Sequence, residues 1–255
     1  MWLRLRQICL VAKELAPAEE ALCDVFGVQV CYRDQGVAKF GLENALFPFG
    51  NQFLEVVAPT QDDTAAGRYI DRRGGDGGYM FITQCDDHAP RHARVQELGV
   101  RTVFEADRPD YRLMQLHPRD TGGTFFEIDE QRGTNAYEVD GPWHPAGPDW
   151  KAGQVLDRVT GISAAEIQCA DPNAIAKRWS DIAQIPLTEE SGISVMALDN
   201  ATARFVPCTD GRPEGLGGID VVAADKAAIL ASAEARGAVS GDNQVTLCGT
   251  RINLV

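Results

Sequence analysis

The chain has little positive charge, few histidines and no long apolar run. Its 255 residues include 24 basic and 37 acidic side chains, which gives a net charge of −13, and only four histidines. Nucleic-acid binding depends on lysine and arginine to neutralise phosphates, so this balance argues against a nucleic-acid partner. No stretch of about 18 apolar residues occurs, and no membrane span is therefore expected.

Several common motifs are also missing. The sequence has no Walker loop, no GxSxG elbow and no HExxH helix. Its glycine-rich run at 74–78 precedes an expected strand rather than a helix, so we interpret it as a turn and not as a phosphate-binding loop. Seven cysteines are scattered without a CxxC pair. Their pattern favours reduced thiols and a cytoplasmic protein.

What the chain does contain is an internal repeat. The segment Phe-Leu-Glu-Val-Val around Glu55 recurs as Phe-Phe-Glu-Ile-Asp around Glu127, 72 positions later. The same offset carries the apolar strand that begins at Gln7 onto the one that begins at Tyr79. A repeat of this kind indicates one site built from two copies of a small module.

Each copy is predicted to contain a strand, a helix and three further strands. Apolar alternation indicates the strands, and glycines at 27 and 99 are typical helix ends. For the first copy we expect a helix that starts near Pro17, strands at 3–12, 28–33, 37–42 and 52–57, and a loop before the last strand. For the second copy we expect a helix after 86–87 and strands at 79–84, 100–106, 112–117 and 124–129.

The second half is predicted to repeat this order after a linker rich in Gly, Pro and Trp, which can continue neither a helix nor a sheet. Strands are expected at 161–170, 194–198, 201–206, 218–223, 244–248 and 250–255. The expected helices begin at Asp171-Pro172 and at Asp225. We predict a first domain of residues 1–135, a linker of residues 136–156 and a second domain of residues 157–255.

Four tandem βαβββ modules resemble the vicinal oxygen chelate (VOC) superfamily, which includes glyoxalase I, methylmalonyl-CoA epimerase, bleomycin-resistance proteins and extradiol dioxygenases. The match is sharpest where Gly-Leu-Glu-Asn-Ala-Leu at 41–46 leads to Gln-Phe-Leu-Glu-Val at 52–56, and in the hairpin 116–123, which is similar to that of the epimerases. The resemblance implies an α+β fold in which tandem βαβββ modules form two glyoxalase-like (VOC) domains with cupped mixed sheets.

The resemblance also implies a divalent metal ion held by the first and last strands of paired modules. On this sequence those positions are Gln7, Glu55, Tyr79 and Glu127. Gln7, Glu55 and Glu127 match the ligands of some glyoxalase I enzymes, whereas Tyr79 stands where histidine is usual. Two carboxylates and an amide suit Mg or Mn better than Zn, Ni or Co.

The strand patterns around Glu55 and Glu127 give different reasons to expect these carboxylates in a functional site. Glu55 lies on a strand that is apolar on both faces, where a buried charge needs a partner or a cation. Glu127 shares its face with Phe125 and Asp129 and can point outward more easily. Either glutamate would serve as the proton-transfer base of a catalytic site. The alternative is that both line a polar, water-filled cup without metal.

Three residues are candidate substrate contacts. Tyr79 could donate a hydrogen bond to a substrate oxygen or simply pack, and Asn44 begins the loop expected before the Glu55 strand. His117 precedes a proline at a hairpin end, where the similar epimerases use the pair structurally. Of the other histidines, His88 and His92 are expected on an exposed helix. His144 is in the linker, where it or its neighbour Trp143 could cover the cup.

Two functions are expected. One is an enzyme in which a metal ion polarises a small oxygenated metabolite for isomerase, epimerase or lyase chemistry next to a carbonyl. The other is a metal-free binding protein of the bleomycin-resistance type, which Tyr79 favours. An extradiol dioxygenase is disfavoured because no histidine follows His144, and that class needs two. The second half is then expected to serve packing, cover or a homodimer interface.

Overall fold

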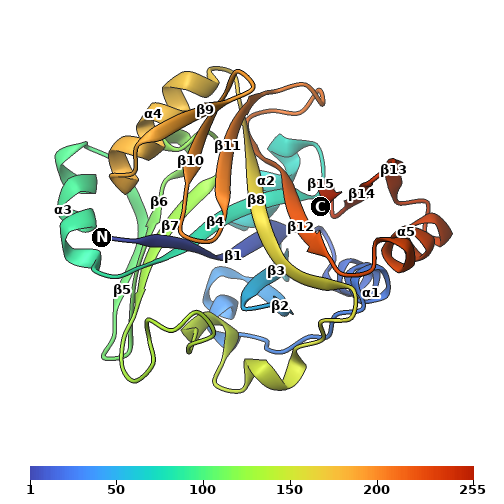
Figure 1. Cartoon of the computed structure of the whole chain (residues 1–255). Coiled ribbons are helices and arrows are strands. Elements are labelled where there is room, and N and C mark those ends of the chain that lie inside the picture. Colours follow the sequence, from blue (N-terminus) through green and yellow to red (C-terminus); the bar gives the residue numbers. More distant parts are fainter. The chain divides into compact units, whose positions relative to one another are not determined.

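The computed structural model describes all residues from 1 to 255, and its strands form two mixed sheets (Figure 1). One sheet has seven strands in the order β2-β3-β1-β4-β7-β6-β5, and the other has eight in the order β13-β14-β15-β12-β8-β11-β10-β9. Two compact units can be distinguished. The first comprises residues 1–7, 79–144 and 164–217, and the second comprises residues 8–78, 145–163 and 218–255.

The first unit combines elements of the second and third predicted modules. Strand β4 (Gly77–Cys85) pairs in parallel with β7 (Phe125–Gln131), which continues antiparallel to β6 (Tyr111–Leu116) and β5 (Thr102–Asp107). The end of β8 (Val159–Cys169) pairs in parallel with β11 (Thr202–Pro207), followed by β10 (Ile193–Ala197) and β9 (Leu187–Glu190). Its helices are α3 (His88–Glu97) and α4 (Pro172–Ala183).

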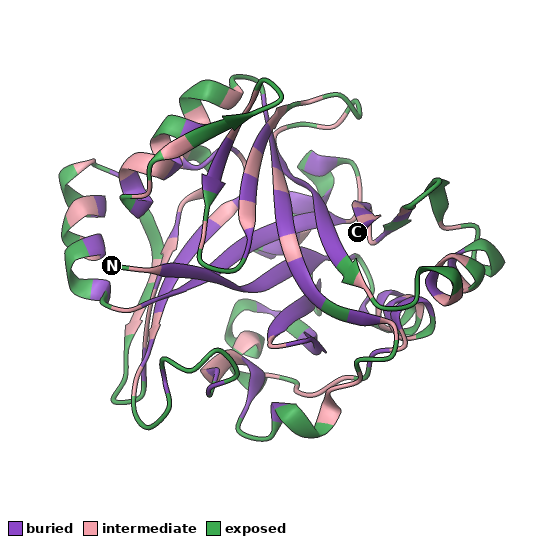
Figure 2. Cartoon of the chain, viewed as in Figure 1, coloured by how far each residue is buried: buried purple, intermediate pink, exposed green.

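An aromatic cluster around Trp179 forms the core of this unit. The Trp179 ring stacks on Phe126 with 4.2 Å between centroids, and it meets Phe81 and Phe205 edge-on at 5.3 and 5.5 Å. Its indole N–H donates to the carbonyl of Thr121. Buried aromatic rings contribute a large share of core packing energy. This packing places the Phe126 side of β7 in the core of the unit, and Figure 2 shows that the central strands are mostly buried.

The second unit combines elements of the first and fourth modules. Strand β2 (Leu42–Phe49) pairs antiparallel with β3 (Gln52–Pro59), and helices α1 (Leu15–Phe26) and α2 (Ala65–Arg73) belong here. Strand β12 (Gly215–Ala223) pairs in parallel with β15 (Thr250–Leu254), followed by β14 (Gln244–Leu247) and β13 (Val239–Gly241). Helix α5 (Lys226–Ala235) contacts α1, and β1 (Leu3–Val11) has residues in both units.

The first module departs from the predicted strand pattern. Residues 28–33 form only an isolated bridge between Tyr32 and Leu46, and residues 35–40 form the 3-10 helix η1 (Gln35–Phe40). Asp34 caps this helix by accepting from the Gly36 N–H, and Gly41 ends it in the left-handed region. The expected loop is instead strand β2. Pro48 is tolerated there because β2 is an edge strand.

Helix α2 was not predicted from the sequence. Thr64 caps it through a 3.0 Å hydrogen bond from the Gly67 N–H, and Gly74 ends it at a φ of 78°. The expected linker also holds structure, namely the 3-10 helices η3 (His144–Ala146) and η4 (Trp150–Gly153). Trp143 and Trp150 are buried, so this segment is anchored to the rest of the chain.

None of the seven cysteines is fully exposed. All seven cysteines are free, and Cys9, Cys85 and Cys169 are buried as expected for small apolar side chains. No helix combines the length and the apolar character that crossing a bilayer would demand. The histidine prediction was partly wrong, because His88 is buried at the start of α3, where its ring stacks on His92.

Candidate functional site

Two acidic side chains lie next to each other on β7. Strand residues alternate between faces, so Glu127 and Asp129 point away from the face on which Phe126 meets Trp179. They are 4% and 0% exposed, so Glu127 does not point outward as the sequence suggested. Burial, followed by the charge and the hydrogen bond of Glu127, raises the pKa of Asp129 well above its usual range. The raised pKa favours the protonated form of Asp129, next to Glu127 on the same strand face.

Tyr111 reaches the same pair from the neighbouring strand. The antiparallel register places Leu113 opposite Asp129 and Tyr111 opposite Gln131, so Tyr111 projects on the face of the two acids. Its hydroxyl donates a short hydrogen bond to Asp129. The Tyr111 ring is buried, and this contact fixes the position of the Asp129 carboxyl.

Trp143 links this group to Gln7. The indole Nε1 donates to Gln7 Oε1 at 2.8 Å, and the indole ring meets the Tyr111 ring edge-on at 5.7 Å. Both Trp143 and Gln7 are buried. A continuous series of contacts within the first unit therefore joins five residues, which we call the Trp143 cluster: Gln7, Tyr111, Glu127, Asp129 and Trp143.

The segment that carries Trp143 is held by two buried arginines of β1. We call residues 136–144 the strap. Arg4 donates to the carbonyl of Glu138 at 2.8 Å and to Gln84, and Arg6 donates to the carbonyls of Val139 and Gly141, both at 2.6 Å. Burial, aided by the neighbouring Arg4, lowers the pKa of Arg6 to about 9. Arg6 thus remains a cation at neutral pH, and the strap carbonyls solvate it.

The strap ends at His144, near the surface. Its backbone N–H donates to Gln131 Oε1 at 2.8 Å, and its ring stacks on Tyr111 with 4.9 Å between centroids. The ring nitrogens lie 3.1 Å from an Asp110 carboxylate oxygen and 2.8 Å from an Arg108 guanidinium nitrogen. His144 therefore connects the strap to the β5–β6 hairpin.

Two other predicted residues of the first unit have mainly structural contacts. Tyr79 is buried, and its ring packs edge-on against Phe125 with 4.8 Å between centroids. His117 caps the 3-10 helix η2 (Pro118–Asp120), where its Nδ1 accepts from the Arg119 N–H at 3.1 Å. Neither contact tests a role in substrate binding, and both roles stay predictions.

Glu55 and Asn44 lie in the second unit and contact each other. Asn44 is on β2 rather than in a loop, and its side-chain N–H donates to Glu55 Oε1 at 2.7 Å. Its amide oxygen accepts from the Asp34 N–H at 2.9 Å, which fixes the amide orientation. The Glu55 carboxylate is buried and held in place by this amide.

The chemistry of the predicted oxygen donors fits a hard divalent cation. No group of three or more His, Cys, Asp and Glu side chains is arranged to hold a metal ion, but the predicted set includes an amide. An amide oxygen has two lone pairs, so accepting from Trp143 does not prevent Gln7 from coordinating. Hydrogen bonds such as the one from Asn44 to Glu55 commonly orient carboxylate ligands.

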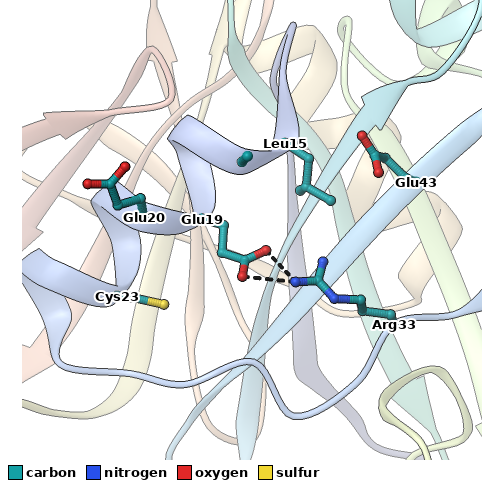
Figure 3. A pocket seen from close by; sticks show the side chains of 7 residues that line it. Leu15, Glu19, Glu20, Cys23, Arg33 and Glu43 are labelled. Carbon is teal, nitrogen blue, oxygen red and sulfur yellow. Dashed lines mark hydrogen bonds and ion pairs between the residues drawn. The ribbon is translucent and has the colours of Figure 1, made fainter.

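The second unit also carries an open hollow of about 580 Å³ (Figure 3). Arg33 is paired there with Glu19 at 2.7 Å, and burial together with Glu19 raises the pKa of the Cys23 thiol. The thiol is therefore a weak nucleophile. Neither Glu55 nor Asn44 lines the hollow, whose lining is Leu15, Ala16, Glu19, Glu20, Cys23, Arg33 and Glu43.

Sequence reasoning did not assign Asp129 and Tyr111 to the site. Asp129 has a signal in the sequence, because it stands two residues after Glu127 and shares its strand face. At the matching position of the first copy, 72 residues earlier, the chain has Val57. Tyr111 has no such signal, since its contact depends on the register of two strands.

Comparison with known proteins gives a family and a fold. Residues 8–183 match a family described as a glyoxalase-like domain, whereas no curated protein matches the chain. A hypothetical protein from Staphylococcus aureus has a similar structure, with 11% identity, a TM-score of 0.66, and coverage of 100% of this chain and 99% of that chain.

Two methylmalonyl-CoA epimerases are also similar over part of the chain. The Streptomyces coelicolor enzyme is 21% identical and covers 51% of this chain and 98% of its own. The Mycobacterium tuberculosis enzyme is 22% identical and covers 52% of this chain and 91% of its own. Both have a TM-score of 0.45.

Proposed function

Because the chain belongs to the glyoxalase-like domain family, we propose that it is an enzyme that moves a proton at a carbon next to a carbonyl group. The substrate class is a small oxygenated metabolite, and the reaction is an isomerisation, an epimerisation or a lyase reaction. The observation that supports this proposal is the buried carboxyl pair Glu127–Asp129. Enzymes place carboxyl groups with altered pKa values where protons are transferred.

In this proposal Glu127 is the catalytic base and Asp129 positions it. Glu127 takes the proton from the substrate carbon, and the C–H electron pair moves toward the carbonyl oxygen. The proton then returns to a carbon, or the electron pair forms a carbon–carbon double bond while a β-substituent leaves with the electrons of its own bond. Asp129 donates a hydrogen bond to Glu127 and accepts one from Tyr111, which holds the base in one orientation.

A divalent ion belongs to the proposal as the electrophile. The resemblance to the VOC superfamily implies Gln7, Glu55 and Glu127 as its ligands, and their oxygen donors suit Mg or Mn better than Zn, Ni or Co. When bound, such an ion polarises the substrate carbonyl and stabilises negative charge on its oxygen. Asn44, Tyr79 and His117 remain proposed substrate contacts.

Deuterium exchange tests the proton-transfer step. The purified chain is supplied with Mn²⁺ in D₂O and screened by NMR against 2-oxo acids, 2-hydroxyketones and 2-substituted thioesters. We expect exchange at the carbon next to the carbonyl, and a loss of about 100-fold or more in Glu127→Gln. Glu130→Gln, on the opposite face of the same strand, is the control. A wild-type chain that binds no divalent ion at micromolar concentration would refute the metal-assisted mechanism.

A metal-free binding protein of the bleomycin-resistance type is the second candidate. Tyr79 favours it, because this aromatic ring packs on Phe125 where the family resemblance implies a nitrogen ligand. Such a protein would be stabilised by aromatic or amphipathic compounds in a thermal-shift screen, and EDTA would not change the shift. Stabilisation that EDTA abolishes would instead support the metal-assisted enzyme.

The cellular setting and assembly state complete the proposal. All seven cysteines are free, as is usual for proteins of a reducing compartment, so we place the chain in the cytoplasm. A homodimer is proposed as the assembly, and sedimentation equilibrium would test it. A monomer at micromolar concentration would contradict that part alone.

A further inference from the structure

We propose that Trp143 is a positioning residue of the site and that it selects the orientation of the Gln7 amide. The strap, expected from the sequence to be a linker, is then part of the binding machinery. The inference rests on the proposed function in one respect, because Gln7 is taken to present an oxygen to a bound cation. The orientation itself does not depend on that assumption.

The chemistry of the two partners fixes the amide orientation. An indole N–H is a donor only, whereas a side-chain amide has an oxygen acceptor at one end and an N–H₂ donor at the other. The two ends have nearly the same shape, so steric packing alone distinguishes them poorly. The 2.8 Å contact from Trp143 Nε1 therefore requires the oxygen of Gln7 to face the strap.

Trp143 can impose this orientation because the strap itself is rigid. Arg4 and Arg6 donate to the backbone carbonyls of five strap residues, and the contacts to Val139 and Gly141 are both 2.6 Å. A Cβ atom at Gly141 would lie only 2.3 Å from the Asn135 carbonyl oxygen, so the chain makes a turn that only glycine fits. The indole then packs against the guanidinium of Arg6 at 5.6 Å.

Trp150 offers a matched comparison within the same predicted linker. It is also buried, and its ring meets Phe53 edge-on with 5.1 Å between centroids. Trp150 belongs to the second unit, and its ring packs on Phe53 rather than on Gln7. Replacing either tryptophan by phenylalanine removes one indole from an aromatic environment, but only Trp143→Phe removes the donor to Gln7.

The test compares Trp143→Phe and Trp150→Phe in the full-length chain. The first readout is the NMR signal pair of the Gln7 side-chain N–H₂ group, assigned by its loss in Gln7→Leu. We expect one sharp pair in the wild type and in Trp150→Phe, and a broadened or doubled pair in Trp143→Phe. The second readout is Mn²⁺ affinity, which we expect to fall about tenfold or more in Trp143→Phe and to stay unchanged in Trp150→Phe.

The outcomes separate this inference from the proposed function. A single, sharp Gln7 pair in Trp143→Phe overturns the inference, and so does a wild-type Mn²⁺ affinity in that variant. If the wild type binds no Mn²⁺, the metal part of the proposed function fails, and the NMR readout alone decides the role of Trp143. If Trp143→Phe does not fold, benzothienylalanine at position 143 keeps the indole shape without the N–H and takes its place in both readouts.

Discussion

The two copies of the repeated strand keep the same glutamate but stabilise it in different ways. In the second copy Glu127 has Asp129 beside it, whose pKa is raised by burial and by Glu127 and whose carboxyl accepts a hydrogen bond from Tyr111. In the first copy the matching neighbour is Val57, and Glu55 is held by the amide of Asn44. A carboxyl group can release its proton, whereas the N–H of a side-chain amide does not ionise under ordinary conditions. The difference suggests that Glu127 is the proton-transfer group and Glu55 a fixed ligand.

The largest expected effect comes from breaking the carboxyl pair. Asp129→Ala leaves buried Tyr111 without its acceptor and opens a cavity, so we expect a loss of about 3 kcal/mol in the free energy of unfolding. Asp129→Asn should lose less than about 1 kcal/mol, because the asparagine amide also has a donor and an acceptor. Urea unfolding at pH 7 measures both. Equal losses in the two variants would mean that Asp129 is ionised.

The helices of the two copies differ as well, and pH reveals the difference. Ala16 in α1 is exposed, whereas the matching residue in α3 is His88, which is buried. The pKa of His88 is lowered to about 4, first by burial and then by the positive charges of Arg112, His92 and Arg132, while Asp107 acts in the opposite direction. At pH values between about 4 and 6.5, the His88 side chain is protonated in the unfolded chain but neutral in the folded chain. The His88 contribution is therefore complete above pH 6.5 and is lost as the pH falls toward 4.

The expected loss is about 3 kcal/mol over this window, since one pKa unit corresponds to about 1.4 kcal/mol. Urea unfolding at pH 7, 5.5 and 4.5 would measure it in the wild type and in His88→Leu. The variant removes this titration while acidic groups elsewhere continue to titrate. Parallel pH profiles for the two proteins would show that His88 takes up its proton without a penalty.

In the first copy the matching change is Asn44→Ala. It removes a hydrogen bond to a buried carboxylate, and we expect a loss of about 1.5–3 kcal/mol in unfolding free energy. If Glu55 is a ligand, Mn²⁺ affinity should also fall about tenfold, because the carboxylate loses the group that orients it. Calorimetric titration with Mn²⁺ checks this, with Asn173→Ala on α4 as the control. An unchanged affinity would separate Asn44 from any ligand role.

Local patterns in the sequence predicted much of the fold but less of the site. The helix end at Gly27 and the cap at Asp171 were correct, because such signals act within one turn of the chain. Strand β2 was missed because an edge position makes Pro48 acceptable, and that position is a property of the whole sheet. The contact between Gln7 and Trp143 joins residues 136 positions apart. No local pattern could have predicted it.

The smallest expected effect concerns the one position at which the two copies differ in the predicted ligand set. Gln7 begins the first copy with an amide, and Tyr79 begins the second with a ring that packs on Phe125. If the second copy is a metal site that has lost its nitrogen ligand, Tyr79→His should raise Zn²⁺ or Ni²⁺ affinity by about tenfold, or about 1.4 kcal/mol. The smaller imidazole also gives up part of the packing on Phe125, so a modest loss of stability should accompany the gain.

Tyr79→Phe keeps the packing and adds no ligand, which makes it the matched control. Competition titration against a chromophoric chelator measures all three proteins. A Tyr79→His variant with wild-type affinity would mean that the imidazole does not reach the predicted ligands, and the 72-residue repeat would then describe the fold without describing the site.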